Sequence, residues 1–192
     1  LGFAGGANRG LAMASGRFLL LLNPDTEILG QPWSEWLAFM ADHPGIGVCG
    51  PRLLNADGTT QSSRRRFPSF GTAVLQRCLP NHPTLRRYYC HDLPEDEPHA
   101  VDWLVGACLL VRREAYEQVG GLDERFFMYS EELDWCRRMA QQGWQAYYYP
   151  RASVLHHEGR SSEQDIPARH INFQRSKILY FRKYLGPLAA AG

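Results

Sequence analysis

The chain has 192 residues, 44% of them hydrophobic and 21% charged, and its formal net charge is +1. These values are ordinary for a soluble globular protein and give no reason to expect binding to nucleic acid or to an anionic membrane through bulk charge. No apolar run reaches the roughly 18 residues that a membrane-spanning helix needs, and no signal peptide is evident. The five cysteines are scattered along the chain, which favours reduced thiols over zinc ligands or disulfides.

Residues 1–10 are rich in glycine. Gly5 and Gly10 have the spacing of a phosphate-binding loop, but the Lys and Ser or Thr that should follow such a loop are missing. We therefore predict a loop that leads into a short helix over residues 11–14, with Asn8 as its cap. Because these first residues look like the middle of a domain, we also expect an amino-terminal portion before them.

An apolar run over residues 18–22 leads directly into Asn23-Pro24-Asp25. A run of this length predicts a strand buried on both faces of a parallel sheet. Pro24 ends ladder hydrogen bonding and forces a turn, so Asp25 is expected at the carboxyl end of the strand, where open α/β sheets bind ligands. A carboxylate there can hold a divalent cation that in turn holds a phosphate. The alternative is that Asp25 only caps a turn.

The middle of the chain predicts a helix, a strand and two loops. Pro32 suits the first turn of a helix, and one face of that helix would bury Trp33, Trp36, Leu37 and Met40. Residues 46–49 predict a short strand, and residues 55–58 predict a turn that joins a small hairpin. The proline-rich residues 80–100 predict a long irregular loop.

Arg64-Arg65-Arg66 form a basic cluster. A solvated loop is the default interpretation, and a site for an anionic acceptor or a lipid phosphate is the alternative.

The second half of the chain predicts alternating strands and helices. Residues 101–111 predict a buried strand that Gly106 interrupts, and glycine in a strand indicates a bulge or the close approach of a ligand. Ser130 is predicted to cap a helix that ends near Gly143, and residues 147–149 and 153–155 predict short strands. Residues 166–185 predict a final helix, and its buried residues would be Ile171, Ile178, Leu179 and Leu185.

The alternation of elements predicts an α/β fold with a mostly parallel sheet flanked by helices. A small antiparallel patch is expected around residues 101–111 and 145–155. We treat residues 1–192 as a single domain.

Three polar clusters together cover the needs of one reaction. Asp25 and an imidazole from His156-His157 could share a metal, Arg160 and Ser161 could bind phosphate oxygens, and the pair 131–132 could take a proton from a hydroxyl. Each cluster also has a structural explanation, because acids in the first turn of a helix are favoured by its dipole.

Five segments carry a family resemblance. They are residues 2–10 (GFAGGANRG), 22–26 (LNPDT), 102–107 (DWLVGA), 120–135 (GGLDERFFMYSEELDW) and 156–161 (HHEGRS). In order and spacing they resemble family 2 glycosyltransferases, and among these the rhamnosyltransferase-like branch. The resemblance implies a GT-A (Rossmann-like) fold and an inverting transfer from a nucleotide-diphosphate sugar.

The resemblance also implies roles for individual residues. Asn23-Pro24-Asp25 stands in the position of the metal-binding DXD motif, with Asn23 replacing an acid, and His156 matches a histidine near the divalent metal (Mg²⁺ or Mn²⁺). Glu131 and Glu132 match the motif that carries the catalytic base, without deciding between the two. The implied donor-binding residues are Asn23, Asn8, Gly6, Arg160 and Ser161, and the acceptor or sugar pocket would comprise Trp103, Gly106 and Asp134.

The sequence thus predicts a cytoplasmic enzyme that moves a sugar, rhamnose by resemblance, to a hydroxyl of a polysaccharide or lipid-linked acceptor. Peripheral contact with the inner face of the plasma membrane is part of this expectation, and nucleic acid is not. Family members normally begin with a strand–helix–strand unit that binds the nucleotide, and this unit is missing before residue 1. An inert nucleotide-sugar-binding fragment or assembly module is therefore the alternative. A glycoside hydrolase is disfavoured, because adjacent glutamates on a helix diverge and cannot flank one bond. Residues 163–192 are expected to form a carboxy-terminal helical segment.

Overall fold

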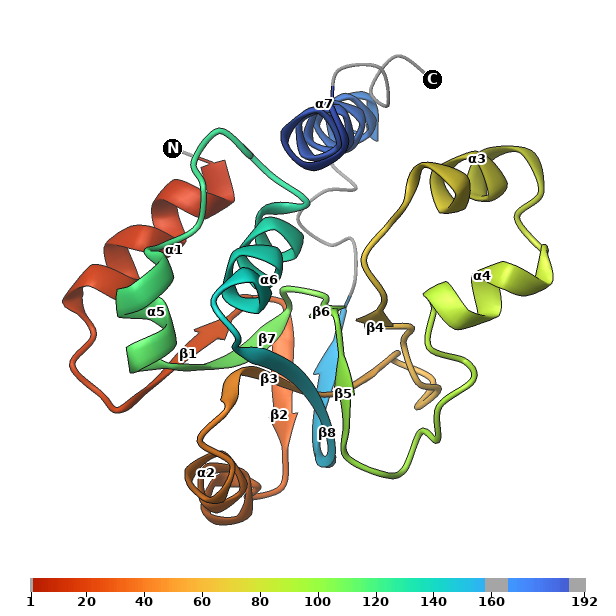
Figure 1. Cartoon of the computed structure of the whole chain (residues 1–192). Coiled ribbons are helices and arrows are strands. Elements are labelled where there is room, and N and C mark those ends of the chain that lie inside the picture. Colours follow the sequence, from red (N-terminus) through yellow and green to blue (C-terminus); the bar gives the residue numbers. More distant parts are fainter. Residues whose placement is uncertain (1, 158–165, 187–192) are drawn as a thin grey trace.

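The structure is a computed structural model that describes residues 2–157 and 166–186 (Figure 1). In chain order the elements are α1 (Gly2–Met13), β1 (Phe18–Leu22), β2 (Thr26–Leu29), α2 (Trp33–Asp42), β3 (Ile46–Leu54), β4 (Arg64–Arg65), α3 (Phe70–Cys78), α4 (Pro83–Tyr88), β5 (His99–Val101), β6 (Trp103–Leu104), β7 (Cys108–Arg112), α5 (Arg113–Val119), α6 (Glu131–Gln141), β8 (Gln145–His156) and α7 (Ile166–Leu185).

The central sheet has the strand order β1-β7-β3-β8-β2, and β5 pairs with β8 outside this path. β3 and β8 form the longest ladder and run parallel. β7 lies antiparallel between β1 and β3, so β1, β3 and β8 share one direction. A separate two-stranded antiparallel sheet joins β4 to β6. The α/β class predicted from the sequence is confirmed, as is antiparallel pairing near residue 101, where β5 pairs with residues 146–148.

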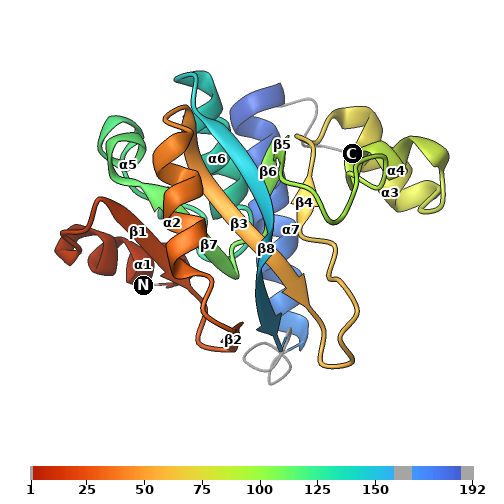
Figure 2. The same ribbon diagram turned by 90° about the horizontal axis from the view of Figure 1, so that it is seen from below.

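Helices cover both faces of the central sheet. α2 lies on one face (Figure 2), where Trp36 and Met40 are buried as predicted and the Trp36 ring stacks on Tyr149. The predicted burial of Leu37 is wrong, because this side chain is exposed. On the other face the core of α1, α5 and α6 includes Trp135, which is fully buried. The sheet therefore lies between two apolar cores, and the candidate functional residues are expected at the ends of its strands.

The predicted loop at the amino terminus is wrong, because Gly2–Met13 form the helix α1. Phe3, Ala4, Ala7 and Leu11 recur at helical spacing and all pack into the core. Burial of this apolar face outweighs the low helix propensity of the intervening glycines.

β1 forms where it was predicted, but its environment differs from the prediction. It pairs with β7 in antiparallel orientation and, among the described strands, lies at the end of the sheet order. Leu19 and Leu21 are buried, whereas Leu20 and Leu22 are exposed. An apolar run cannot by itself distinguish a strand with two covered faces from one with alternating burial.

Three other predictions need correction. The region 80–100 contains the helix α4, because Pro83 suits its first turn and Leu85 and Tyr88 are buried beneath it. The strand predicted over residues 101–111 is divided among β5, β6 and β7, with the expected break at Gly106. The two strands predicted over 147–155 are one strand, β8.

α7 has the predicted bounds, but its buried face was predicted wrongly. Ser176, Tyr180 and Phe181 are buried, whereas Ile171, Ile178 and Leu185 are exposed. Polar contacts determine this orientation. Lys183 lies 2.6 Å from the carboxylate of Asp134 on α6, and the hydroxyl of Tyr184 donates a hydrogen bond to the same carboxylate.

Candidate functional site

The turn after β1 presents the first two candidate side chains. The backbone N–H of Asn23 donates to the carbonyl of Ala107 (2.9 Å), and the N–H of His157 donates to the carbonyl of Asp25 (2.9 Å). The hydroxyl of Thr26 closes the turn on the carbonyl of Asn23 (2.6 Å). The turn is therefore fixed between the start of β7 and the end of β8.

Asp25 and His156 lie together, as the metal hypothesis requires. Nε2 of His156 is 3.6 Å from Oδ1 of Asp25, and Nδ1 of the same ring is 2.9 Å from Oε1 of Gln61. The amide nitrogen of Gln61 donates to the carbonyl of His156 (2.8 Å) and to Oδ1 of Asn55 (2.9 Å).

These contacts determine the tautomer of the imidazole. Because the amide nitrogen of Gln61 donates to two oxygens, its Oε1 is the acceptor and Nδ1 of His156 carries the proton. In the neutral form of imidazole that binds metals, Nε2 then presents its lone pair to the carboxylate of Asp25. Two acceptors facing each other in this way favour a cation or a proton between them.

The carboxylates of Glu131 and Glu132 form the second cluster, in the first turn of α6. Tyr129 and Ser130 precede them with positive φ values of 70° and 64°, a costly conformation for non-glycine residues that is common at functional sites. Ser130 occupies the predicted cap position but makes no side-chain cap bond. The strained turn fixes the direction in which the two glutamates leave the helix.

Burial raises the pKa of both glutamates. For Glu131, which is 5% exposed, desolvation is the larger cause and the charge of Glu132 the smaller one. Desolvation also raises the pKa of Glu132, and a backbone hydrogen bond from Gly106 partly offsets it. The pair thus holds a proton more tightly than free carboxylates do, which suits a group that must accept one during a reaction.

Gly106 and Ala107 connect the two clusters. A Cβ placed on Gly106 would lie 3.5 Å from Cβ and Cγ of Glu132, and the neighbouring carbonyl of Ala107 holds Asn23. The end of β1 and the start of α6 therefore flank the same two residues.

Unsatisfied polar atoms concentrate at these clusters. Among the described residues, the buried side-chain oxygens without a hydrogen-bond partner include Oδ1 of Asn23, Oδ1 of Asp25, Oε2 of Glu131 and Oε2 of Glu132. Buried polar atoms are nearly always paired in proteins, so such a group of orphans indicates atoms that a ligand satisfies.

Oxygen and imidazole donors of this kind suit Mg²⁺ or Mn²⁺. Asn23, Asp25 and His156 supply them, although no cluster of three His, Cys, Asp or Glu side chains able to hold a metal occurs within residues 2–157 and 166–186. Asn23 stands where a third acidic side chain would complete the cluster, and it offers a neutral amide oxygen instead. These residues therefore fit a cation that also takes oxygen ligands from a bound substrate.

The basic cluster 64–66 is not the solvated loop predicted by default. Arg64 is buried, with its guanidinium 4.6 Å from the ring centroid of Tyr148. Arg65 lies close enough to Glu132 for its charge to lower the pKa of that carboxyl. Pairing of β4 with β6 brings Arg65 to the site. The sequence analysis did not assign Arg65 or Gln61 to the site, and a cluster of like charges beside a strand was the available signal for Arg65.

Several predicted site residues have other partners. Asn8 bridges α1 to the backbone N–H and carbonyl of Leu122. Gly6 is exposed on the same helix. Asp134 is fully buried and contacts Arg138 and Lys183. These contacts explain how α1 and α7 are held.

Trp103 packs against the core, and its indole N–H donates to the carbonyl of Arg66 (2.9 Å). Arg160 and Ser161 lie outside the described residues.

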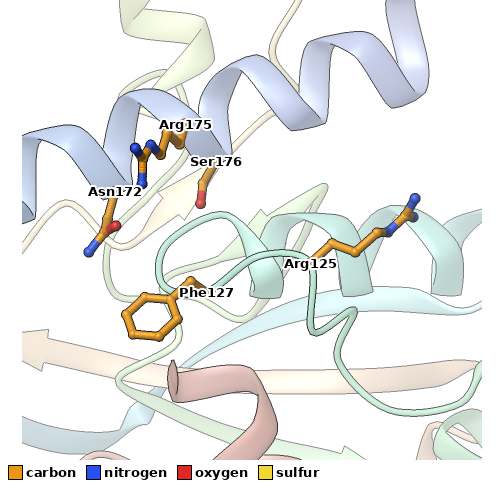
Figure 3. A pocket seen from close by; sticks show the side chains of 5 residues that line it. All are labelled: Arg125, Phe127, Asn172, Arg175 and Ser176. Carbon is orange, nitrogen blue, oxygen red and sulfur yellow. The ribbon is translucent and has the colours of Figure 1, made fainter. Parts of the chain in front are cut away.

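A pocket of about 400 Å³ lies between α7 and the segment that leads into α6 (Figure 3). Asn172, Arg175 and Ser176 line it from α7, and Arg125 and Phe127 line it from the other side. Arg175 and the amide of Asn172 give this pocket polar groups, whereas the guanidinium of Arg125 is already paired with Asp123. The pocket adjoins the strained turn before the glutamates.

The fold belongs to the GT-A class of glycosyltransferases. Its structural relatives include the crystal structure of GalNAc-T7 with UDP, GalNAc and Mn²⁺, with a TM-score of 0.56 and 17% sequence identity over 82% of this chain and 31% of that chain. The sequence model described as Glycosyltransferase like family 2 matches residues 3–170, and the chain belongs to this family.

Relatives with curated names include rhamnosyltransferases. The N-acetylglucosaminyl-diphospho-decaprenol L-rhamnosyltransferase of Mycobacterium tuberculosis is 36% identical, with 86% of this chain and 61% of that protein covered. Rhamnosyltransferase WbbL of Escherichia coli K12 is 38% identical over 52% of this chain and 37% of its own length. The chain thus spans less than two thirds of these relatives. Within its described part, no helix is both long and apolar enough to cross a bilayer.

Proposed function

We propose that the chain carries the catalytic centre of an inverting glycosyltransferase. The enzyme would transfer a sugar from a nucleotide-diphosphate donor to a hydroxyl of a polysaccharide or lipid-linked acceptor. The observation that carries this proposal is the set of orphaned oxygens on Asn23, Asp25, Glu131 and Glu132. Two of these belong to cation-type ligands and two to candidate bases, on either side of Gly106 and Ala107.

Glu132 is our candidate for the base. Its side chain lies against Gly106, next to Ala107, whose carbonyl holds the Asn23 turn. Its raised pKa suits a group that takes a proton from the acceptor hydroxyl, a contribution of about 10²–10⁴-fold in rate. Glu131 would stay protonated when Glu132 is ionised, because the negative charge of Glu132 raises the pKa of Glu131.

Asn23, Asp25 and His156 are our candidates for holding Mg²⁺ or Mn²⁺ with the donor diphosphate. A bound divalent cation would supply charge that stabilises the leaving diphosphate. Gln61 orients His156 for this purpose. Arg65 adds fixed positive charge beside Glu132, where an anionic substrate group is drawn towards the site.

Rhamnose is the proposed sugar, and a lipid-linked diphosphate is the proposed kind of acceptor. Support comes from the named specificity of the Mycobacterium tuberculosis relative, which covers most of this chain. The free state of all five cysteines supports a reducing compartment such as the cytoplasm.

Sugar transfer can be tested by incubating the protein with thymidine-diphosphate rhamnose, Mn²⁺ and a lipid-linked acceptor. We expect release of thymidine diphosphate and inversion at the anomeric carbon by NMR. Glu132→Gln should lower the rate at least about 100-fold, whereas Glu114→Gln, an exposed glutamate on α5, should not change it. Equal rates for both variants would reject Glu132 as the base.

A nucleotide-sugar-binding module without catalysis is the second candidate, and the amide at Asn23 favours it. Calorimetry with thymidine diphosphate and Mn²⁺ separates the two. Binding without turnover of any donor would support the module, and binding with turnover would support the enzyme.

A further inference from the structure

Positive charge is segregated in this nearly neutral chain. Residues 58–91 contain six arginines and no acidic residue, and residues 166–186 contain three arginines, two lysines and no acidic residue. All 20 acidic residues and only ten of the 21 basic ones lie elsewhere. A net charge of +1 therefore conceals two strongly basic segments and an acidic remainder.

The two basic segments meet in the fold. The first contains α3 and α4 and the second contains α7, and Figure 1 shows α3 beside α7 on the same side of the molecule. Arg77 on α3 is near enough to Lys177 on α7 for its charge to contribute, after desolvation, to the lowered pKa of that ammonium group. Arg77 thus adds one positive charge from α3 to the basic surface of α7, which carries three arginines and two lysines.

The outward face of α7 is both apolar and basic. Residues 171, 175, 178, 182 and 185 follow the alternating spacing of four and three that defines one helix face. Ile171, Ile178 and Leu185 are 49%, 38% and 40% exposed, and Arg175 and Arg182 are exposed between them. The opposite face, which includes Tyr180, packs on the protein.

α3 repeats this pattern. Phe70, Val74 and Arg77 lie four and three residues apart on one face, and Phe70 and Val74 are 50% and 43% exposed. No residue of α3 is buried. Large apolar side chains are therefore displayed on both helices that carry the positive charge.

We propose that this surface, the α3–α7 face, docks on a membrane that contains anionic lipids. Lys and Arg side chains attract anionic headgroups, and apolar side chains between them insert at the headgroup–acyl boundary. Nucleic acid would match the charge but would give the interleaved isoleucines, phenylalanine and leucine no apolar environment. The proposal rests on exposure and charge and does not depend on sugar transfer.

Vesicle sedimentation of the full chain tests the electrostatic part. Binding is expected to vesicles of phosphatidylcholine with 30% phosphatidylglycerol, to weaken with salt, and to be absent with phosphatidylcholine alone. Replacing Arg175 and Arg182 by Gln should weaken binding about 30-fold, at about fivefold for each charge near the surface. The matched control replaces Arg9 and Arg151, which are exposed outside the face, and should leave binding within about twofold.

A second pair of variants tests the apolar part. Ile171→Ser with Ile178→Ser should weaken binding to the same vesicles about tenfold or more through lost apolar burial. Met13→Ser, at an 87% exposed position on α1, should not change it. Thermal unfolding of each variant checks that it is folded. Absence of vesicle binding by the unaltered chain, equal losses in the control variants, or unchanged binding of the isoleucine variant would overturn the proposal.

Discussion

Gln61 orients His156, the proposed metal ligand. Replacing Gln61 by Met therefore tests the orientation of the ligand without removing the ligand itself. Methionine keeps the length of the side chain and removes its hydrogen bonds. The three lost bonds join Gln61 to the ring of His156, the carbonyl of His156 and the side chain of Asn55, at 2.8–2.9 Å. The substitution leaves the side chains of His156 and Asp25 themselves unaltered.

The expected magnitudes follow from these contacts. Each hydrogen bond contributes about 1 kcal/mol net, so Gln61→Met should lower the free energy of unfolding by about 2–3 kcal/mol. Loss of a partner that orients a metal-binding histidine typically weakens metal affinity about 10–100-fold. The ring would also lose the bond that fixes its proton on Nδ1, leaving Nε2 less available to a cation.

Calorimetric titration with Mn²⁺ in the presence of thymidine diphosphate measures the affinity, and thermal unfolding measures the stability. Gln118→Met is the matched control, because Gln118 also makes side-chain hydrogen bonds, to Trp144 and Gln142, on an exposed surface. It should leave Mn²⁺ affinity unchanged. If Gln61→Met binds Mn²⁺ as tightly as the unaltered protein, then Gln61 does not orient a metal ligand.

Three other substitutions test individual residues. Glu132→Gln should raise the free energy of unfolding, more at pH 8 than at pH 5. The pKa of this carboxyl is raised in the folded state, so the folded protein loses stability as the pH rises above the pKa of the unfolded state. Urea unfolding at the two pH values measures this effect. A difference between the variant and the unaltered protein that does not depend on pH would contradict it. Asp134→Ala should lower stability by about 3–5 kcal/mol, because it removes the fully buried carboxylate that pairs with Lys183 and Arg138. A change below about 1 kcal/mol in the same assay would refute the anchoring role. Asn8→Ala should lower the free energy of unfolding by about 1–3 kcal/mol, because Asn8 makes two hydrogen bonds to Leu122, and should leave the affinity for thymidine diphosphate unchanged. A loss of affinity at unchanged stability would instead support the donor-binding role.

Local sequence patterns predicted β1, α2, α6 and α7, but not α1 or α4, and not which faces are covered. The bounds of β1 and α7 match the prediction because apolar content is a local signal. Their exposed faces were missed because these depend on partners distant in sequence. The orientation of α7 is determined by Asp134 and Lys183, which no periodicity reveals.

Glycine misled the analysis at α1 and informed it at Gly106. In α1 the apolar positions, which pack into the core, decide the conformation despite the glycines. At Gly106 the predicted interruption of the strand is confirmed, because β6 ends at Leu104 and β7 begins at Cys108. Gln61 gave no local signal at all, since its role arises only when β8 brings His156 beside it.

The central claim is that Asp25 and Glu132 both stabilise the transition state of the same sugar-transfer reaction. A double-mutant cycle on kcat/KM for sugar transfer, with Asp25→Asn and Glu132→Gln, tests it most directly. We expect each substitution alone to reduce the rate strongly, and the double variant to be little worse than the poorer single one, because residues that act as a unit are non-additive. Losses that simply multiply, or an unaltered rate in either single variant, would contradict the account.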